Sequence, residues 1–252
     1  MGAPAVPHLS VKAAIVRPVS RTFATAIIHR YEWLGTMAHS DVHFGIFFGQ
    51  FCAGVTCVCT NGGGTAGAHA HKQFGIERRE LATLVRGACV HWAPPNSNSK
   101  LVTWTCKLLA GRGQRLIWAF SDTDAGEIGT IYQACGWTCV GRTAPHEEWV
   151  SPGGRVMNRA LPSQIVKRHG LTWDDATKAL VDAGWKVQKD NRKLRYCKVL
   201  DAKDKRLVDK IESMRVPYPK RPNAGKATQD ALPNQGEKAR CRSEVPAPDE
   251  KE

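Results

Sequence analysis

The stretch SDTDAGEIGTIYQACGW, residues 121–137, decides the fold of this chain. It follows the apolar run RLIWAF at 115–120, which predicts a buried strand, and it leads into WTCVGRT at 137–143, which predicts another. Between them, GEIGTIYQACG at 126–136 favours a short helix. A strand, a helix and a strand in this order indicate a layered fold in which helices pack on a sheet.

The segment before this stretch also alternates between predicted strands and helices. Apolar and β-branched runs predict four more strands, and helical periodicity predicts two more helices. The strands are VKAAIV (11–16), VHFGIFFGQ (42–50), FCAGVTCVCT (51–60) and ELATLVRGACV (80–90), and the helices span 20–35 and 98–113. The order β-α-β-β-β-α-β-α-β predicts an α/β (α+β) fold, a mixed sheet flanked by helices.

The charge of the chain is large and unevenly spread. Its 36 Lys/Arg and 23 Asp/Glu residues give a formal net charge of +13. Residues 151–222 carry 18 basic against 8 acidic residues, a net of +10, whereas residues 1–150 carry 13 against 9, a net of +4. A basic block of this size favours a polyanionic partner such as nucleic acid, with a merely solvated basic surface as the alternative.

Three regions are expected along the chain: a catalytic domain at 10–150, a basic appendage at 155–222, and a polar, disordered tail at 223–252. In the appendage, two short helices are expected around Gly170. Its basic residues alternate with Trp185 and Tyr196, a pattern that suits phosphate contact and base stacking. The candidate nucleic-acid-binding residues are Arg192, Lys193, Arg195, Lys198, Lys220 and Arg221.

The cysteines and the apolar runs indicate in which cellular compartment the protein is expected. Nine cysteines occur without a CxxC pair, which favours reduced, mostly buried thiols rather than a disulfide framework. No apolar run reaches the roughly 18 residues of a membrane span, and no signal peptide is visible. We therefore expect a soluble, cytoplasmic protein.

Four motifs, in this order, resemble a known family. YEWLGTM (31–37), LVRGACV (84–90), NSNSKLV (96–102) and the stretch at 121–137 are together similar to the Mom family of phage DNA-modification proteins, a divergent branch of the GNAT acetyltransferase superfamily. The resemblance covers about residues 12–145. It implies a GNAT-like fold and modification of adenine at N6 in phage DNA, which hides that DNA from restriction enzymes in the host cytoplasm.

The resemblance also implies catalytic residues. Tyr132 would be a general acid, and Asp122, beside Ser121, would act where the strand ends. Glu32 and Trp33 stand where such proteins commonly carry a His-Tyr pair. The alternatives without a catalytic role are that Tyr132 packs the helix and that the acidic residues form a solvated turn. Asp124 and Glu127 are expected to stabilise the helix start through its dipole.

A divalent ion, iron by resemblance, is a possible cofactor. Carboxylate oxygens suit hard divalent cations, so Glu32 and Asp122 are the candidate ligands. The missing histidine argues against an iron site, although His29 could replace it from the same helix. His69 and His71 form a second candidate pair, without an evident third ligand nearby.

An acyl-CoA-like donor is implied as well, but its phosphate site departs from the superfamily. The Gly-rich loop is replaced by APPNSNSK at 93–100. The candidates at this helix start are Asn96, Ser97, Ser99 and Lys100. Helix capping explains Asn96 and Ser97 equally well.

Three functions remain open at this stage. The first is a DNA-modifying transferase that adds a small acyl or carbamoylmethyl-like group to a base, with adenine N6 favoured. The second is a GNAT acyltransferase for a protein or a small amine, which leaves the basic block unexplained. The third is a non-catalytic nucleic-acid-binding protein. The first predicts that Asp122, Tyr132 and Glu32 face one cleft.

Overall fold

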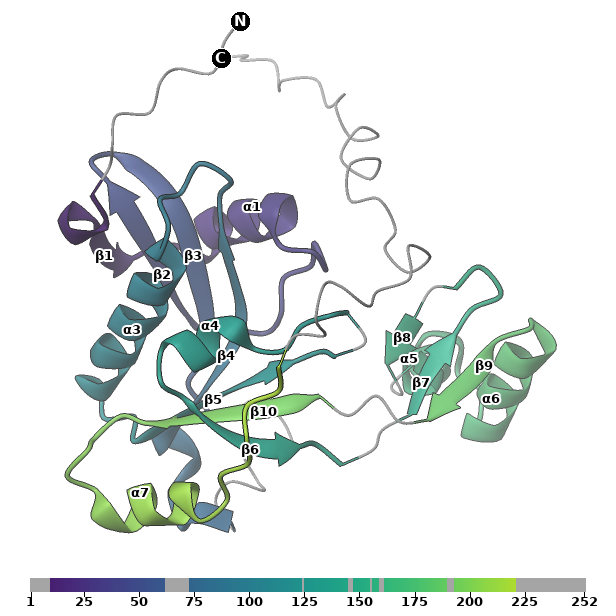
Figure 1. Ribbon diagram of the computed structural model, residues 1–252. Coiled ribbons are helices and arrows are strands. Elements are labelled where there is room, and N and C mark those ends of the chain that lie inside the picture. The colour runs from purple at the N-terminus through teal and green to yellow at the C-terminus, as the bar shows by residue number, and fades with distance from the viewer. Residues whose placement is uncertain are drawn as a thin grey trace, which may run out of the picture. The chain divides into compact units, whose positions relative to one another are not determined.

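A computed structural model describes residues 10–61, 73–123, 125–144, 147–154, 156–158, 161–189 and 193–220 (Figure 1). The chain divides into a unit that ends at Tyr218 and a second that begins at Pro219. Several sequence predictions fall outside the described residues: those for His69, His71, Asp124, Arg192, Arg221 and the tail 223–252.

One mixed sheet of seven strands organises the first unit, in the order β1-β2-β3-β4-β5-β10-β6. Neighbouring strands run antiparallel, except that β4 and β5 run parallel. The strands are β1 (Ile15–Pro18), β2 (Val42–Phe48), β3 (Phe51–Cys59), β4 (Leu81–Cys89), β5 (Leu116–Ser121), β6 (Thr138–Arg142) and β10 (Leu194–Val199). The predicted mixed sheet is confirmed.

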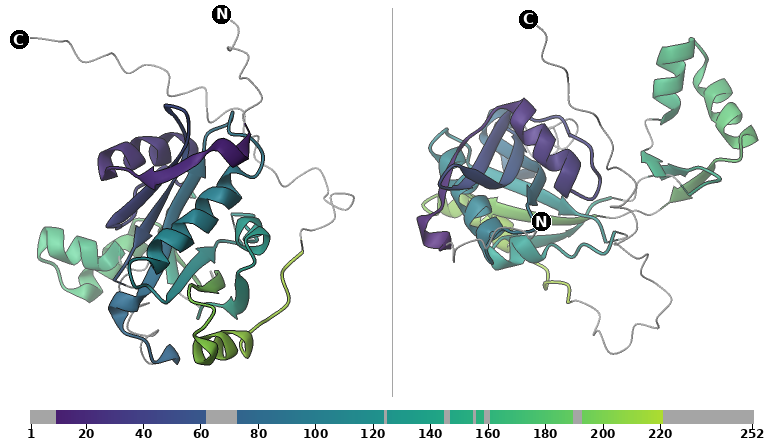
Figure 2. Two further views of the ribbon diagram at one scale, coloured as in Figure 1. Left: turned by 90° about the vertical axis from the view of Figure 1, so that its left-hand side faces the viewer. Right: turned by 90° about the horizontal axis from the view of Figure 1, so that it is seen from above.

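Helices cover both faces of this sheet (Figure 2). Along β5, Ile117 packs in the core beneath α3 and α4, and the adjacent Leu116 packs in the core beneath α7. On β3, Cys57 packs against α1, on the face opposite α3. The helices are α1 (Arg21–Tyr31), α3 (Ser97–Ala110), α4 (Thr130–Ala134) and α7 (Lys205–Glu212). Among the described residues, no helix is long and apolar enough to cross a membrane.

The ends of α1 place the residues that follow it. Ser20 begins the helix, because its hydroxyl accepts a hydrogen bond from Phe23 N at 3.2 Å. The helix ends at Tyr31, with Glu32 as its C-cap. It is therefore shorter than the predicted span of 20–35. The loop that follows turns at Gly35, whose φ of +58° favours glycine.

Residues 155–222 do not form one separate appendage, because β10 belongs to the main sheet. It lies between β5 and β6 and pairs with both, with Leu194 opposite Ser121 and Cys197 opposite Thr138. Tyr196 and Cys197 are fully buried in cores on opposite faces, as an interior strand requires. Arg195 and Lys198, which flank this pair, made the segment look exposed in the sequence.

Between β6 and β10 the chain forms a small β/α module with the strand order β8-β7-β9, whose first strand in the chain, β7, precedes the expected appendage, whereas α7 packs on the main sheet. The two predicted helices are present on either side of Gly170, and Thr172 caps the second. Trp149, Ala176 and Leu180 are buried. The elements are β7 (Glu147–Val150), β8 (Val156–Asn158), α5 (Leu161–His169), α6 (Trp173–Asp182) and β9 (Lys186–Lys189).

The parallel pair β4–β5 is held together at one end and parts at the other. Its register runs from Leu81 opposite Leu116 to Leu84 opposite Ala119. Beyond that point β4 pairs only with β3, and the end of β5 pairs with β10. The strands therefore separate toward their C-terminal ends, where polar residues of a parallel pair commonly bind ligands.

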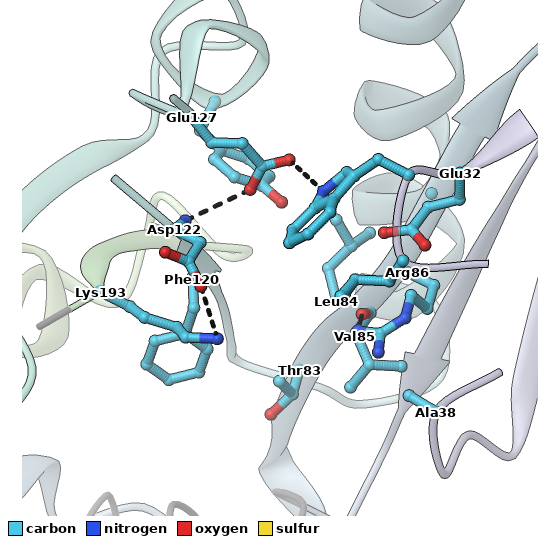
Figure 3. Close-up of a pocket in the computed structure, with 14 residues that line it drawn as sticks. Glu32, Ala38, Thr83, Leu84, Val85, Arg86, Phe120, Asp122, Glu127 and Lys193 are labelled. Atoms are coloured by element: carbon cyan, nitrogen blue, oxygen red, sulfur yellow. Dashed lines mark hydrogen bonds and ion pairs between the residues drawn. The ribbon is translucent and has the colours of Figure 1, made fainter. Parts of the chain in front are cut away.

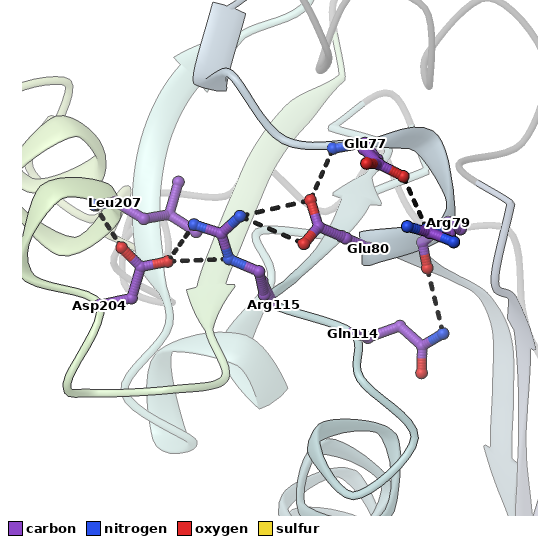
Figure 4. Close-up of polar contacts among 7 residues, drawn as sticks. All are labelled: Glu77, Arg79, Glu80, Gln114, Arg115, Asp204 and Leu207. Carbon is purple, nitrogen blue, oxygen red and sulfur yellow. Dashed lines mark hydrogen bonds and ion pairs between the residues drawn. The ribbon is translucent and has the colours of Figure 1, made fainter.

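An ionic cluster closes the other end of the pair (Figure 4). Arg115, just before β5, bonds Glu80, just before β4, at 3.2 Å and Asp204 at 2.6 Å. Asp204 also caps α7, since its carboxylate accepts from Leu207 N at 3.2 Å. One arginine thus joins the starts of two strands and a helix.

Candidate functional site

A cleft of about 370 Å³ lies where β4 and β5 part. In Figure 3, Asp122, Phe120 and Lys193 stand on one side and Glu32, Val85 and Arg86 on the other. The lining residues are Glu32, Trp33, Leu34, Ala38, Thr83, Leu84, Val85, Arg86, Gly87, Phe120, Asp122, Glu127, Tyr132 and Lys193.

Four of the five predicted catalytic residues line this cleft, although they come from distant segments. Glu32 and Trp33 follow α1, Asp122 follows β5, and Tyr132 lies in α4. Ser121 does not line it, because it is the last residue of β5 and is only 2% exposed. The expected convergence of Asp122, Tyr132 and Glu32 is thus present in the structure.

Asp122 forms an ion pair with Lys193, with 3.1 Å between Oδ2 and Nζ. The Asp122 side chain is 12% exposed and that of Lys193 is 34% exposed, so the pair is partly shielded from water. Lys193 was predicted to contact nucleic acid through the appendage. It precedes β10 and lines the cleft, because β10 lies in the main sheet and not in a separate appendage.

Glu127 joins both sides of the cleft, a role that sequence analysis missed. Its Oε1 accepts a hydrogen bond from Trp33 Nε1 at 2.9 Å, and its Oε2 accepts one from Asp122 N at 3.3 Å. It precedes the N-terminus of α4, because that helix begins only at Thr130, so a dipole role at the helix start does not describe it. The paired glycines Gly126 and Gly129, both with positive φ, were the sequence signal for a turn here.

Tyr132 packs its ring between two aromatic residues. Ring centroids lie 5.0 Å from Trp137 and 5.3 Å from Tyr196. Burial raises the pKa of the phenol well above its ordinary value of 10, so it stays protonated at neutral pH. Its hydroxyl has no hydrogen-bond partner among the described residues. A protonated phenol at a cleft can donate a proton.

Glu32 holds its carboxylate at the opposite wall. Its Oε2 accepts a hydrogen bond from Gly35 N at 3.1 Å. Burial raises the pKa of Glu32, and the nearby Arg86 guanidinium only partly offsets this. Arg86 is itself anchored, because it donates to the carbonyl oxygens of Thr36 at 2.9 Å and Val85 at 2.7 Å. A carboxylate of raised basicity can accept a proton.

The predicted divalent metal does not fit these residues. Within the described ranges no three His, Cys, Asp or Glu side chains gather to hold an ion. Glu32 faces Arg86, and Asp122 faces Lys193, so a cation would compete with a positive charge at each ligand. His29 is exposed and does not line the cleft. We therefore assign no metal role to Glu32 and Asp122.

The predicted phosphate-binding residues at α3 are largely engaged within the protein. Ser97 donates its hydroxyl to Pro94 O at 2.6 Å, and Lys100 Nζ donates to Val11 O at 2.7 Å and to Lys12 O at 2.9 Å. Asn96 is the N-cap in a left-handed conformation, with φ of 68°, and its side chain makes no capping bond. Neither these residues nor Ser99 line the cleft.

The predicted basic stripe is likewise built into the sheet. Arg195 donates to Val140 O at 3.5 Å, and Lys198 donates to Gly136 O at 3.1 Å. Tyr196 is buried rather than free to stack on a base, and its hydroxyl donates to Ile128 O at 2.5 Å. Its ring lies so close to Gly129 that any larger residue there would collide with it. Lys220 is exposed.

A model of the Mom protein family matches residues 13–220 of this chain. No curated protein matches it.

Solved structures similar to the chain are acetyltransferases and a related synthase. The ribosomal-protein-S18-alanine N-acetyltransferase from Escherichia coli shares 9% identity over 75% of this chain and 94% of its own, with a TM-score of 0.42. FeeM, an N-acyl amino acid synthase from uncultured soil microbes, shares 15% over 74% and 91%, with a TM-score of 0.43. Spermidine/spermine N-acetyltransferase SpeG from Vibrio cholerae shares 8% over 75% and 94%, with a TM-score of 0.42. Likeness at these scores leaves the activity to be argued from the residues of this chain.

Proposed function

Since this chain belongs to the Mom protein family, we propose that it is a DNA-modifying transferase that adds a small acyl or carbamoylmethyl-like group to a DNA base, adenine at N6. The modified base would protect the DNA from restriction enzymes. The observation that carries the proposal is the meeting of Glu32, Asp122 and Tyr132 in the cleft between β4 and β5. These residues come from three separate segments, and each brings a group that can act on a proton.

The proton affinities of two residues support opposite roles in the transfer. Glu32, with its raised pKa, accepts the proton that the attacking amine nitrogen loses as the new bond to carbon forms. Tyr132 is protonated at neutral pH and gives its proton to the departing group, although burial makes the phenol a weaker acid. Asp122, paired with Lys193, orients the amine by accepting a hydrogen bond from it.

An acyl-CoA-like donor is part of this proposal, on the resemblance to the GNAT superfamily. Such a thioester would supply the transferred acyl group, and the departing atom that takes the Tyr132 proton would be its sulfur. Phosphate contacts at Ser97 and Lys100 are not part of the proposal, because both side chains are already bonded within the protein.

DNA as the partner is supported by charge. The net charge of +13 attracts a polyanion over long range, and Lys220 is an exposed contributor. Chemistry on a base within a duplex requires that base to leave the stack, at a cost of a few kcal/mol, or a single-stranded substrate. Affinity for DNA should therefore fall steeply with salt, because bound phosphates release counterions.

The test is a nucleoside analysis. The protein is expressed in bacterial cells that carry a plasmid, and the plasmid is digested to nucleosides for mass spectrometry. We expect a new nucleoside heavier than deoxyadenosine, together with resistance of the plasmid to restriction enzymes. The Asp122→Ala protein, expressed at the same level, should give neither. Unmodified plasmid from cells that contain folded wild-type protein would refute the proposal.

A second candidate is acyl transfer to a small amine. Glu32 can accept the proton of an attacking amine nitrogen whichever molecule carries that nitrogen. The same cells discriminate the two, since acylated polyamines with unmodified plasmid would support this second candidate.

A further inference from the structure

We propose that Trp33 is the surface on which the acceptor base stacks, and that Glu127 holds the indole in place for it. The inference rests on the proposed function and says how its nucleic-acid substrate is held. Trp33 is an exposed tryptophan that lines the cleft, whereas the exposed Trp104 and Trp173 do not line it.

Trp33 is 57% exposed although it lines the cleft. No aromatic ring or cation of the described residues stacks on its indole. Two other tryptophans differ from it in this respect. Trp118 is 2% exposed, and the ring of Trp104 is covered by the Lys107 ammonium at 4.9 Å. The Trp33 ring therefore has exposed surface on which a ligand can stack.

The edge of the same ring is fixed. Trp33 Nε1 donates to Glu127 Oε1 at 2.9 Å, and the other oxygen of that carboxylate accepts from Asp122 N at 3.3 Å. The indole is thus tied to the end of β5, across the cleft from its own loop. A ring that is already oriented loses little conformational freedom when a flat ligand stacks on it.

The surroundings of the ring suit a nucleobase. Leu34 and Phe120 are apolar, while Glu32 and Asp122 can accept hydrogen bonds and Lys193 can donate them. A purine offers a flat apolar face with donors and acceptors around its edge. The cleft of about 370 Å³ is within the size range of small-ligand pockets, about 300–1,000 Å³.

The position of Trp33 also brings a stacked base close to the proposed reacting groups. A base stacked on Trp33 lies in the same cleft as Asp122, whose backbone N–H is bonded to the carboxylate that holds the indole. The stacking surface and the proposed reacting groups are therefore joined through the Glu127 carboxylate, which makes Glu127 a positioning residue. Base–aromatic stacking contributes enough that its removal weakens binding by about 10- to 100-fold per base.

The experiment uses a short single-stranded oligonucleotide that carries 2-aminopurine, a fluorescent adenine analogue, so that no base pair has to open. We expect the wild-type protein to quench the fluorescence as the base stacks. Trp33→Phe keeps an aromatic face and should keep most of the quenching. Trp33→Leu removes the face and should abolish the quenching and weaken binding by about 10-fold or more.

Trp104→Leu is the matched control, since Trp104 is 41% exposed but does not line the cleft, and it should behave as the wild type. Wild-type protein that does not bind or does not quench would overturn the inference, as would equal quenching by Trp33→Leu. Nucleoside analysis runs in parallel. Unmodified DNA together with quenching that depends on Trp33 would refute the transfer and keep the stacking. Modified DNA with unchanged quenching in Trp33→Leu would support the transfer and refute the stacking.

Discussion

Both ends of the β4–β5 pair carry acidic and basic side chains, but these side chains are arranged differently at each end. At the paired end, Arg115 lies between the carboxylates of Glu80 and Asp204, and each charge has a partner (Figure 4). At the parted end, Glu32, Asp122, Glu127 and Lys193 line open space (Figure 3). The first arrangement joins elements, and the second leaves groups accessible to a ligand.

The proton affinities of the two ends follow this difference. Hydrogen bonding to Arg115 lowers the pKa of Asp204. Burial acts to raise the pKa of Glu80, but its hydrogen bonds to Glu77 N and Arg115 outweigh it and leave the pKa lowered. At the cleft, burial raises the pKa of Glu32 and of Tyr132. The paired end thus stabilises its charges, whereas burial at the cleft favours the protonated forms of Glu32 and Tyr132.

The largest expected effect is at the parted end. Asp122→Ala should abolish DNA modification, because it removes the acceptor at the end of β5 and frees Lys193. The free energy of unfolding should change by less than about 1 kcal/mol, since the Lys193 side chain is 34% exposed and can be rehydrated. Nucleoside mass analysis and thermal unfolding measure the two quantities. Full activity in Asp122→Ala would remove Asp122 from the site.

Tyr132→Phe should reduce the modification rate by about 100-fold or more, the usual contribution of a positioned general acid. The phenyl ring keeps the contacts with Trp137 and Tyr196, so the melting temperature should stay the same. Initial rates at equal protein concentration measure the loss. A wild-type rate in this variant would leave Tyr132 with a packing role alone.

Arg115→Met should show the opposite pattern at the paired end. It leaves two carboxylates without their partner, so the protein should lose about 1–2 kcal/mol of stability, a figure reduced because the arginine side chain is 38% exposed. The modification rate per folded molecule should be unchanged. Urea unfolding measures the stability, and a lowered rate in folded protein would show that the two ends are coupled.

This cluster also has a pH signature. The carboxyl groups of Glu80 and Asp204 have lowered pKa values in the folded state, so their stabilising effect is present above the ordinary values of 4.5 and 3.8. It is lost as the pH falls through the folded-state values. Between pH 7 and pH 3, the free energy of unfolding should therefore change less for Arg115→Met than for the wild type.

Glu127→Gln should reduce the modification rate by about 10-fold with little change in stability. The glutamine oxygen can accept from Trp33 Nε1 or from Asp122 N, but its amide group cannot accept from the other. A double-mutant cycle with Trp33→Phe measures the link, because phenylalanine has no N–H to lose. Additive effects of the two substitutions would mean that Glu127 does not act through Trp33.

The smallest effect should be a gain in stability. The pKa of Glu32 is raised in the folded state, so its ionisation opposes folding as the pH rises from 4.5 through the raised value. Glu32→Gln should therefore be more stable than the wild type at pH 7 by less than about 1 kcal/mol, and equal to it near pH 4. Urea unfolding at both values tests this, and a less stable variant at pH 7 would contradict it.

Local patterns predicted most of the fold. The apolar runs at β2 to β5 and the cap at Ser20 each depend on neighbouring residues, and they gave the element order. The place of β10 could not be found this way, because its pairing with β5 joins residues far apart in the chain. Its Arg195 and Lys198 look exposed in sequence, although the backbone between them is interior.

Some residues of the candidate site could be predicted from the sequence, and others could not. Asp122, Tyr132, Glu32 and Trp33 were predicted because their motifs resemble a family, and the structure gathers them in one cleft. Glu127 and Lys193 were assigned other roles, since their partners Trp33 and Asp122 lie in other segments. Hydrogen bonds between distant segments leave no periodicity in a sequence. Such contacts become visible only when the fold brings the segments together.

The position of β10 has a consequence for how the protein is made. A ribosome releases β5 and β6 first, then the β7–β9 module, and only afterwards residues 194–199. Until then the two strands that flank β10 lack the neighbour between them, and Tyr196 is not there to occupy the space beside Gly129. Lys193 emerges immediately before the missing strand. The nascent chain therefore has no complete cleft until nearly all of its folded part has been synthesised. Premature termination before residue 194 leaves β5 and β6 with unpaired strand edges.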